Sequence, residues 1–289
     1  MKSLITGETT SFLFQANILG KYPVDYFRCD QTGFIQTELP YWLDEAYSTA
    51  ITASDIGLVQ RNITVSKLSI KMIDKLKTPK ERFLDFGGGY GLFTRLMRDA
   101  GYPFLHYDKL CSNIFAVGFE GAIEDSNEDG LDPIVQYDVI TAWEVFEHLT
   151  NPFDVTQNLI NLADHVFFST ILVPDQPISN ASEWWYFMPE TGQHVSFYTV
   201  ASLRYIATKL GLHFYTDGSS YHLFSRVPLP EDPFQLSLSE RIVRSFRRRF
   251  VSNRTKHGSR QSLIEHDYRS VMARFEREAK EKEDDYGTT

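Results

Sequence analysis

The residues best suited to chemistry are gathered in one short segment, Glu144-Val-Phe-Glu147-His148. Two carboxylates and an imidazole within about one helical turn are close enough to converge on one point. An imidazole that titrates near neutral pH can take a proton from a substrate hydroxyl. The same three groups can instead hold a divalent ion that lowers the pKa of a bound hydroxyl, or simply hold the loop together by hydrogen bonds. We predict that His148 is the base, assisted by Glu147, and that no metal ion is bound.

A second candidate base, His194, lies in an aromatic segment that runs from Trp184 to Tyr198. This histidine either acts on the substrate or packs the loop against the core. We predict that Tyr198 hydrogen-bonds a substrate. Trp184 and Trp185 either stack on the apolar face of a sugar or fill the core, as most aromatic side chains do.

A glycine-rich run, Asp85-Phe-Gly87-Gly-Gly89-Tyr-Gly91, separates an apolar strand from a helix. Glycine is required where a ligand approaches the backbone or where φ is positive, and the start of a helix offers unpaired N–H groups. A dinucleotide fingerprint needs glycine at its first, third and sixth positions. Because Leu92 occupies the sixth position when Gly87 is counted as the first, the spacing argues against a dinucleotide.

Asp108 follows the next predicted strand, 108 − 91 = 17 residues beyond Gly91. An acidic residue at this place suits bidentate hydrogen bonding to the two hydroxyls of a ribose. The alternative is a solvated carboxylate in a loop. We predict the ribose role.

The run Asp-x-Gly-x-Gly-x-Gly resembles the first motif of class I S-adenosylmethionine-dependent methyltransferases. The resemblance covers about residues 80–215 and implies that S-adenosylmethionine is the cofactor, with the carboxylate of Asp85 near its ammonium group. The Glu-x-x-Glu-His segment is similar to that of small-molecule and sugar methyltransferases of this class, which places Glu144 beside the cofactor. Ubiquinone-pathway O-methyltransferases use a matching segment for magnesium. The implied cofactor residues are Asp85, Gly87, Gly89, Gly91, Asp108 and Glu144.

The residues from Tyr26 to Phe34 are similar to the start of some sugar carbon-methyltransferases. Those proteins carry Cys-x-x-Cys in this region and bind zinc. Here Cys29 is followed three residues later by Thr32, so we predict no zinc site. What remains of the similarity is the expectation of an N-terminal cap over the cleft.

Hydrophobic periodicity predicts alternating strands and helices in the middle of the chain, hence an α/β fold. We expect a Rossmann-like, mostly parallel sheet with helices on both faces and an antiparallel edge hairpin. The expected elements are a helix over 64–77, a strand at Arg82–Phe86, a helix with its apolar stripe at Leu92, Phe93, Leu96, Met97 and Ala100, strands at Phe104–Tyr107, Asp138–Trp143 and Val166–Val173, a helix that begins at Asn151-Pro152, a helix from Thr199 to Leu210, and a hairpin of Leu212–Thr216 with Tyr221–Arg226.

Three regions follow from this pattern: an N-terminal cap of residues 1–62, a core of 63–228 and a helical C-terminal extension of 229–289. The cap shows no clear period. The extension has a basic run, interpreted as a solvated helix face or as a contact for an anionic substrate or membrane surface. It also has an apolar stripe that packs on the core or forms a homodimer. The basic run comprises Arg241, Arg244, Arg247, Arg248, Arg249, Arg254, Lys256 and Arg260, and the stripe comprises Ile264, Tyr268, Val271 and Phe275.

Composition narrows the function classes. The formal net charge of -9 disfavours nucleic acid as a partner. No apolar stretch is long enough to span a bilayer. The two cysteines, Cys29 and Cys111, do not provide a disulfide framework, so we expect a cytoplasmic protein. The Asp/Asn-Pro-Pro-aromatic segment of DNA amino-methyltransferases is absent after the fourth strand, as is the cysteine of cytosine-carbon methyltransferases.

We therefore expect methyl transfer from S-adenosylmethionine to a small molecule. The leading expectation is O-methylation of a saccharide or glycan precursor, because the Glu144, Glu147 and His148 cluster suits an acceptor that must lose a proton. Carbon methylation of a sugar nucleotide is one alternative. A cofactor-binding protein without catalysis, which acts as an assembly partner, is the other.

Overall fold

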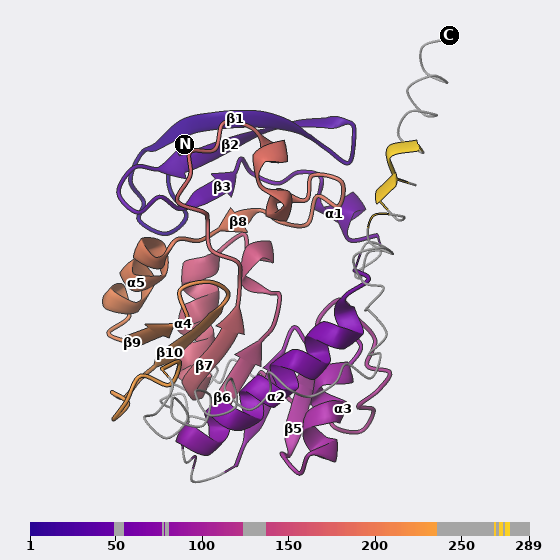
Figure 1. Ribbon diagram of the computed structural model, residues 1–289, viewed down its shortest axis with the longest axis vertical. Helices are drawn as coiled ribbons and strands as arrows, with labels where there is room; N and C mark the ends of the chain where they lie inside the picture. The colour runs from indigo at the N-terminus through magenta and orange to yellow at the C-terminus, as the bar shows by residue number, and fades with distance from the viewer. Residues whose placement is uncertain are drawn as a thin grey trace, which may run out of the picture.

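The computed structural model describes residues 1–48, 55–76, 78, 81–123 and 137–235, with residues 269, 272, 273 and 275–277 near the C-terminus. Two sheets organise this part of the chain. A six-stranded core sheet lies beneath a four-stranded N-terminal sheet, and the predicted α/β class is confirmed (Figure 1).

The core sheet has the strand order β5-β4-β6-β7-β10-β9. Its first four strands are parallel, and β10 runs antiparallel to both β7 and β9, which confirms the predicted edge hairpin. Because β4 has β5 on one side and β6 on the other, the chain reverses its winding direction at β4, where α/β sheets bind ligands. The strands are β4 (Phe83–Phe86), β5 (Phe104–Tyr107), β6 (Tyr137–Ala142), β7 (Ala163–Ser169), β9 (His213–Thr216) and β10 (Tyr221–Ser225).

Helices cover both faces of the core sheet, as the side chains of adjacent strand residues show. Phe83 belongs to an apolar cluster with residues of α2 (Leu58–Leu76) and α3 (Leu92–Asp99). Its neighbour Leu84 belongs to a second cluster with residues of α4 (Pro152–Leu162) and α5 (Val200–Lys209). Since successive side chains of a strand point to opposite faces, each pair of helices buries one face.

The N-terminal sheet was not predicted from the sequence. It has the antiparallel order β1-β2-β3-β8, in which β8 comes from the far end of the core. Its apolar face packs on the aromatic segment around η2 (Ala181–Glu183) and η3 (Trp185–Phe187). The strands are β1 (Thr10–Ile18), β2 (Tyr22–Cys29), β3 (Ile35–Thr37) and β8 (Ser196–Phe197), and α1 (Leu43–Ala46) follows β3.

Several predicted boundaries shift. Helix α2 begins at Leu58 and therefore runs through residue 62, where we placed the end of the cap. Strand β7 spans Ala163–Ser169 and ends before the predicted Val173. The basic run and all of the apolar stripe except Phe275 lie outside the described residues. Among the described helices, none combines the length and apolar character needed to cross a membrane.

Candidate active site

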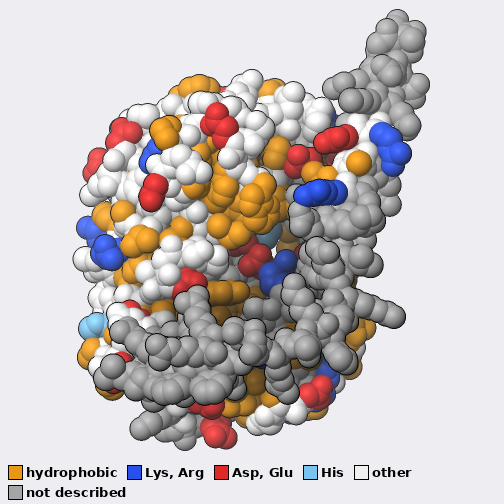
Figure 2. All heavy atoms as spheres, viewed as in Figure 1, with side chains coloured by type: hydrophobic (Ala, Val, Ile, Leu, Met, Phe, Trp, Pro, Cys, Tyr) orange, Lys and Arg blue, Asp and Glu red, His pale blue; other side chains and the backbone are white. Residues whose placement is uncertain are grey.

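A cavity of about 1220 Å³ opens at the carboxyl ends of β4 and β6, where α1 and the segment from Trp185 to His194 face the core sheet. Figure 2 shows the hollow on this face, where acidic, basic and histidine side chains come together. Typical small-molecule sites measure roughly 300–1000 Å³. The cavity therefore has room for two small molecules side by side.

The glycine loop between β4 and α3 forms one wall of this cavity. Gly87 has φ +68, and a Cβ at this position would lie 2.6 Å from Cγ2 of Val145. Gly91 has φ +85 and begins α3, and a Cβ there would lie 2.5 Å from Oδ1 of Asn113. Side chains other than hydrogen are thus excluded at both positions, and backbone faces the cavity.

Asp85 lies at the end of β4 and is 1% exposed. Its carboxylate accepts hydrogen bonds from Oγ1 of Thr141 at 2.9 Å and Oγ1 of Thr94 at 3.3 Å, and no cation contacts it among the described residues. Burial raises the pKa of Asp85 to about 7 despite these two bonds. A cationic group placed in the cavity beside Asp85 would satisfy the buried charge, which fits the ammonium group implied by the sequence motif.

Asp108 follows β5 and is held by backbone N–H groups. Its Oδ2 accepts from Gly89 N at 2.8 Å, and its Oδ1 accepts from the N–H groups of Leu110 and Cys111 at 2.7 Å each. Two carboxylate oxygens offer about four acceptor sites in total. Asp108 therefore retains roughly one free site, on Oδ2, for a ribose hydroxyl, and fully bidentate binding would require the bond to Gly89 to be shared.

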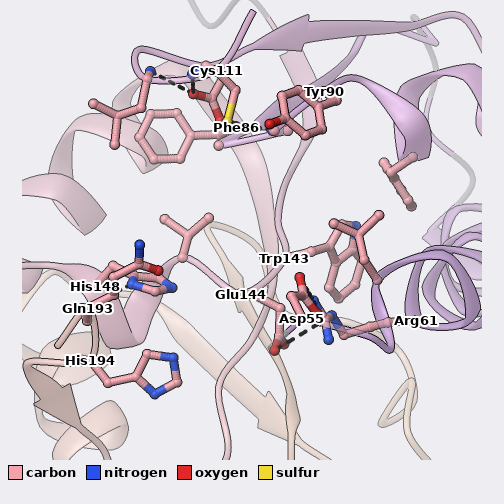
Figure 3. Close-up of a pocket in the computed structure, with 18 of the residues that line it drawn as sticks. Asp55, Arg61, Phe86, Tyr90, Cys111, Trp143, Glu144, His148, Gln193 and His194 are labelled. Atoms are coloured by element: carbon pink, nitrogen blue, oxygen red, sulfur yellow. Dashed lines mark hydrogen bonds and ion pairs between the residues drawn. The ribbon is translucent and has the colours of Figure 1, made fainter. Parts of the chain in front are cut away.

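Glu144 lies on the cavity wall in a strained conformation, with φ 54. Ser169 holds it by donating from Oγ to Oε1 at 2.6 Å and accepting from its backbone N at 2.8 Å. Oε2 lies 3.7 Å from Nε of Arg61, whose Nη2 binds both oxygens of Asp55 at 2.8 Å (Figure 3). One guanidinium group thus lies between two carboxylates, so Arg61, Asp55 and Glu144 together carry a net negative charge.

His148 faces the cavity from the 3-10 helix η1 (Phe146–His148), on the opposite side from Arg61 (Figure 3). Its Nδ1 lies 3.0 Å from the carbonyl oxygen of Gln193 and 3.0 Å from the hydroxyl of Tyr47. A carbonyl only accepts, so this contact assigns the proton to Nδ1. The lone pair of Nε2 has no partner in the described part of the chain and is left open to the cavity.

His194 is arranged in the same way. Its Nδ1 donates to the carbonyl oxygen of Tyr186 at 2.7 Å, which leaves Nε2 with the lone pair. The two imidazole rings meet edge to face with centroids 4.9 Å apart. His194 also lines the cavity, although only 8% of it is exposed. The structure therefore brings both candidate bases together.

These two histidines are much weaker bases than the sequence suggested. Burial lowers the pKa of His148 to about 4, and burial with the neighbouring His148 lowers the pKa of His194 to about 3. The expectation of an imidazole that titrates near neutral pH is therefore wrong. Both side chains are neutral acceptors across the physiological range.

Glu147 is fully buried behind the histidines and does not line the cavity. Its Oε1 accepts from the hydroxyl of Tyr186 at 2.7 Å, and its Oε2 has no partner in the described chain. Burial, with the charge of Glu144 nearby, raises the pKa of Glu147 to about 8. Glu147 therefore has no direct contact with a molecule bound in the cavity.

Glu147, His148 and His194 each offer a ligand atom, and these atoms lie within 4.8 Å of one another. This set of one carboxylate and two imidazoles has the chemistry to hold a divalent ion, and the backbone carbonyls that fix each Nδ1 are typical of metal-binding histidines. The sequence analysis grouped Glu144 with Glu147 and His148. In the structure Glu144 lies near Arg61 instead, and His194 is the third member of the set. The absence of a metal stays a prediction.

Of the three predicted substrate residues, only Trp185 lines the cavity, and it is 59% exposed. Trp184 packs under the N-terminal sheet against Phe187, with ring centroids 5.1 Å apart. Tyr198 is fully buried and donates its hydroxyl to the carbonyl oxygen of Phe146 at 2.8 Å. The structure does not bring Trp184 or Tyr198 to the cavity.

A family model described as a methyltransferase domain matches residues 60–216. This span contains the glycine loop, both histidines and most of the cavity wall. The chain belongs to this methyltransferase family. The match confirms the resemblance drawn from Asp85 to Gly91, and with it S-adenosylmethionine as the methyl donor. A search of curated proteins found no match.

Solved methyltransferase structures match this chain at low sequence identity and low TM-score. One is CalO1, a methyltransferase in calicheamicin biosynthesis, with 16% identity, coverage of 57% of this chain and 55% of that one, and a TM-score of 0.38. Another is the CurJ carbon methyltransferase, with 16% identity, coverage of 65% and 61%, and a TM-score of 0.43. A third is the mitomycin 7-O-methyltransferase MmcR, with 12% identity, coverage of 55% and 53%, and a TM-score of 0.36. The matched part thus spans between half and two thirds of each of these proteins.

Sequence reasoning missed several polar residues of the methyltransferase cavity, among them Arg61, Asp55, Tyr47 and Gln193. Arg61 lies on α2, and Asp55 precedes that helix. Tyr47 follows α1, and Gln193 contributes its backbone carbonyl to His148. A single arginine on an amphipathic helix, or a tyrosine in a segment without clear period, carries no signal that separates it from a surface residue.

Proposed function

We propose that the protein transfers a methyl group from S-adenosylmethionine to a hydroxyl group of a small molecule. The observation that carries this proposal is His148, whose Nε2 lone pair is open to the same cavity as the glycine loop. When bound, the cofactor supplies a methyl group already activated by its sulfonium. The protein then has two tasks, which are to align the acceptor and to take its proton.

The cofactor end of the cavity is the glycine loop with Asp85 and Asp108. Asp85 provides a buried charge for the ammonium group, and Asp108 provides an acceptor for the ribose. Phe86 and Tyr107 stack with centroids 5.7 Å apart on the same wall and offer a flat apolar surface. The backbone, carboxylates and rings present thus fit the cofactor.

The acceptor end is the region between His148, His194 and Trp185. His148 Nε2 accepts the hydroxyl proton as the oxygen–carbon bond forms, and its protonated Nδ1 stays anchored on Gln193. A base with a lowered pKa remains unprotonated and ready at every pH above about 5. His194 stands beside it as the second imidazole and is the rival base.

For the acceptor we propose a saccharide or a similar polyhydroxylated molecule. Trp185 presents a half-exposed indole face at the cavity, which suits stacking on the apolar face of a sugar ring. Arg61, the cation of the cavity wall that faces Glu144, is already shared by Asp55 and Glu144. This arrangement favours a neutral acceptor over the diphosphate of a sugar nucleotide.

The test is methyl transfer by the purified protein to a panel of monosaccharides, disaccharides, phenols and sugar nucleotides, with the mass gain measured and its position found by NMR. We expect methyl on oxygen, at a rate that His148→Ala lowers at least a hundredfold. Methyl on carbon of a sugar nucleotide would support the alternative reaction. Cofactor binding without transfer to any acceptor would support a non-catalytic role, and methyl on nitrogen would contradict the proposal.

A further inference from the structure

One glycine of the loop, Gly88, is not required by the backbone. It occupies a variable position of the run Asp-x-Gly-x-Gly-x-Gly, and its φ is outside the left-handed region that Gly87 and Gly91 adopt. A Cβ at Gly88 would lie 2.5 Å from Oδ2 of Asp85 and 2.8 Å from Cδ2 of His106. Two other side chains therefore fill the space that a side chain of residue 88 would need.

One of these side chains, His106, comes from β5 and contacts the loop. Its Nε2 lies 2.9 Å from the carbonyl oxygen of Gly89. Because a carbonyl only accepts, this contact assigns the proton to Nε2, and the imidazole is the donor. His106 is 3% exposed and does not line the cavity, so it has no direct contact with a molecule bound there.

The backbone of Gly89 is held on two sides by the end of β5. Its N–H donates to Oδ2 of Asp108 at 2.8 Å, and its carbonyl oxygen accepts from His106. A ribose that binds both oxygens of Asp108 competes with this N–H for Oδ2. The bond from His106 involves no group that the ribose uses, so it can hold Gly89 when the bond to Asp108 is shared.

We propose that His106 is a positioning residue for the cofactor, which holds the carbonyl of Gly89 and thereby keeps the loop in the shape that binds the ribose. Gly88 is then a glycine because the imidazole passes beside it. This inference rests on the proposed cofactor end of the cavity, and it is independent of the acceptor and of the atom that is methylated. The motif reveals neither residue, since Gly88 is at a variable position and His106 is on another strand.

The test compares His106→Gln with His106→Met. The two new side chains have nearly the same length, but only glutamine has an amide N–H that can take the place of the imidazole Nε2. Dissociation constants for S-adenosylhomocysteine are measured by calorimetry on the full chain, after circular dichroism has shown that each variant is folded. We expect His106→Met to weaken binding about fivefold, the size of one neutral hydrogen bond, and His106→Gln to bind as the wild type does.

His222→Met is the matched control. His222 is also fully buried, and its Nε2 lies 3.0 Å from the carbonyl oxygen of Thr170, but it does not line the cavity and does not contact the loop. His222→Met should lose thermal stability, as His106→Met does, and retain wild-type affinity. If His106→Met does not fold, His106→Asn replaces it, because its shorter amide places no donor at the position of Nε2.

Wild-type affinity in the variant that lacks the donor overturns the proposal, and so does equal weakening in His106→Gln or in His222→Met. These results leave the proposed cofactor end of the cavity intact, because the wild type still binds. A wild-type protein that does not bind S-adenosylhomocysteine at all would contradict the proposed cofactor site itself, and the role of His106 with it.

Discussion

Binding of the cofactor should release a proton from Asp85, and this linkage can be calculated from the structure. Burial raises the pKa of Asp85 from 3.8 to about 7. At about 1.4 kcal/mol for each pKa unit, holding the charged carboxylate there costs on the order of 4 kcal/mol. The ammonium group of a bound ligand offsets this cost, so the pKa of Asp85 should fall when the ligand binds.

The direction of the pH effect follows from this shift. Below pH 7 the free protein holds a proton on Asp85 that the complex does not, so affinity rises with pH until about 7. At pH 6, one unit below the pKa, binding should release about 0.9 proton. Between pH 5 and 6.5 the association constant should rise nearly tenfold per pH unit.

The assay is calorimetric titration with S-adenosylhomocysteine at pH 6 in buffers of different ionisation enthalpy, which counts released protons. Asp85→Asn should bind more weakly and release almost none. Asp99→Asn is the control, because Asp99 is an exposed residue of α3 that pairs with Arg95. Equal proton release by the wild type and Asp85→Asn would refute the reasoning, since the proton would then come from another group.

Three further predictions concern the cavity wall. Gly87→Val should lower affinity for S-adenosylhomocysteine at least tenfold by calorimetry, because its Cβ would clash with Val145 in the cavity wall. Gly101→Ala should not, because Gly101 shares the positive φ but a Cβ there meets nothing within 4 Å. At saturating cofactor, the wild-type pH–rate profile should be flat from about pH 5.5 to 8 and unaffected by chelator, since the pKa of His148 is about 4. A neutral limb that disappears in His148→Ala, or activity that chelator abolishes and magnesium restores, would count against His148 as an unassisted base. Tyr186→Phe should reduce the free energy of unfolding by about 1–3 kcal/mol in urea titration, because it removes the only side-chain hydrogen bond that the buried Glu147 carboxyl makes within the described part of the chain. A loss below about 0.5 kcal/mol would mean that water already hydrogen-bonds that carboxyl.

The parts of the fold that the sequence predicted are those whose signals are local. Strand β4 is a short apolar run that ends in glycines, and α3 has an apolar stripe closed by Gly101. The N-terminal sheet lacked such a signal because a bulge interrupts β1 between Phe12 and Phe14. Phe12 is 61% exposed and Phe14 is buried, so aromatic side chains lie on both faces and no alternation is visible.

The candidate site also has a part that the sequence predicted and a part that it did not. The glycine loop and the Glu-x-x-Glu-His segment were found because each is contiguous in the chain. The contact of Tyr47 with His148 joins residues 101 positions apart, and only the folded sheet arrangement brings them together. Burial also cannot be read from a motif, which is why His148 was expected to titrate near neutral pH.

The pairing of β3 with β8 has a consequence for synthesis of the chain. Ile35 pairs with Phe197, so 197 − 35 = 162 residues must follow Ile35 before its partner exists. At roughly 5–20 residues per second, the early hairpin leaves the ribosome and waits for about 8–30 s with the backbone groups of β3 uncovered. An uncovered strand edge recruits other strands. Nascent chains that stop before residue 196 should therefore be captured by chaperones or aggregate, while chains that pass it close the edge themselves.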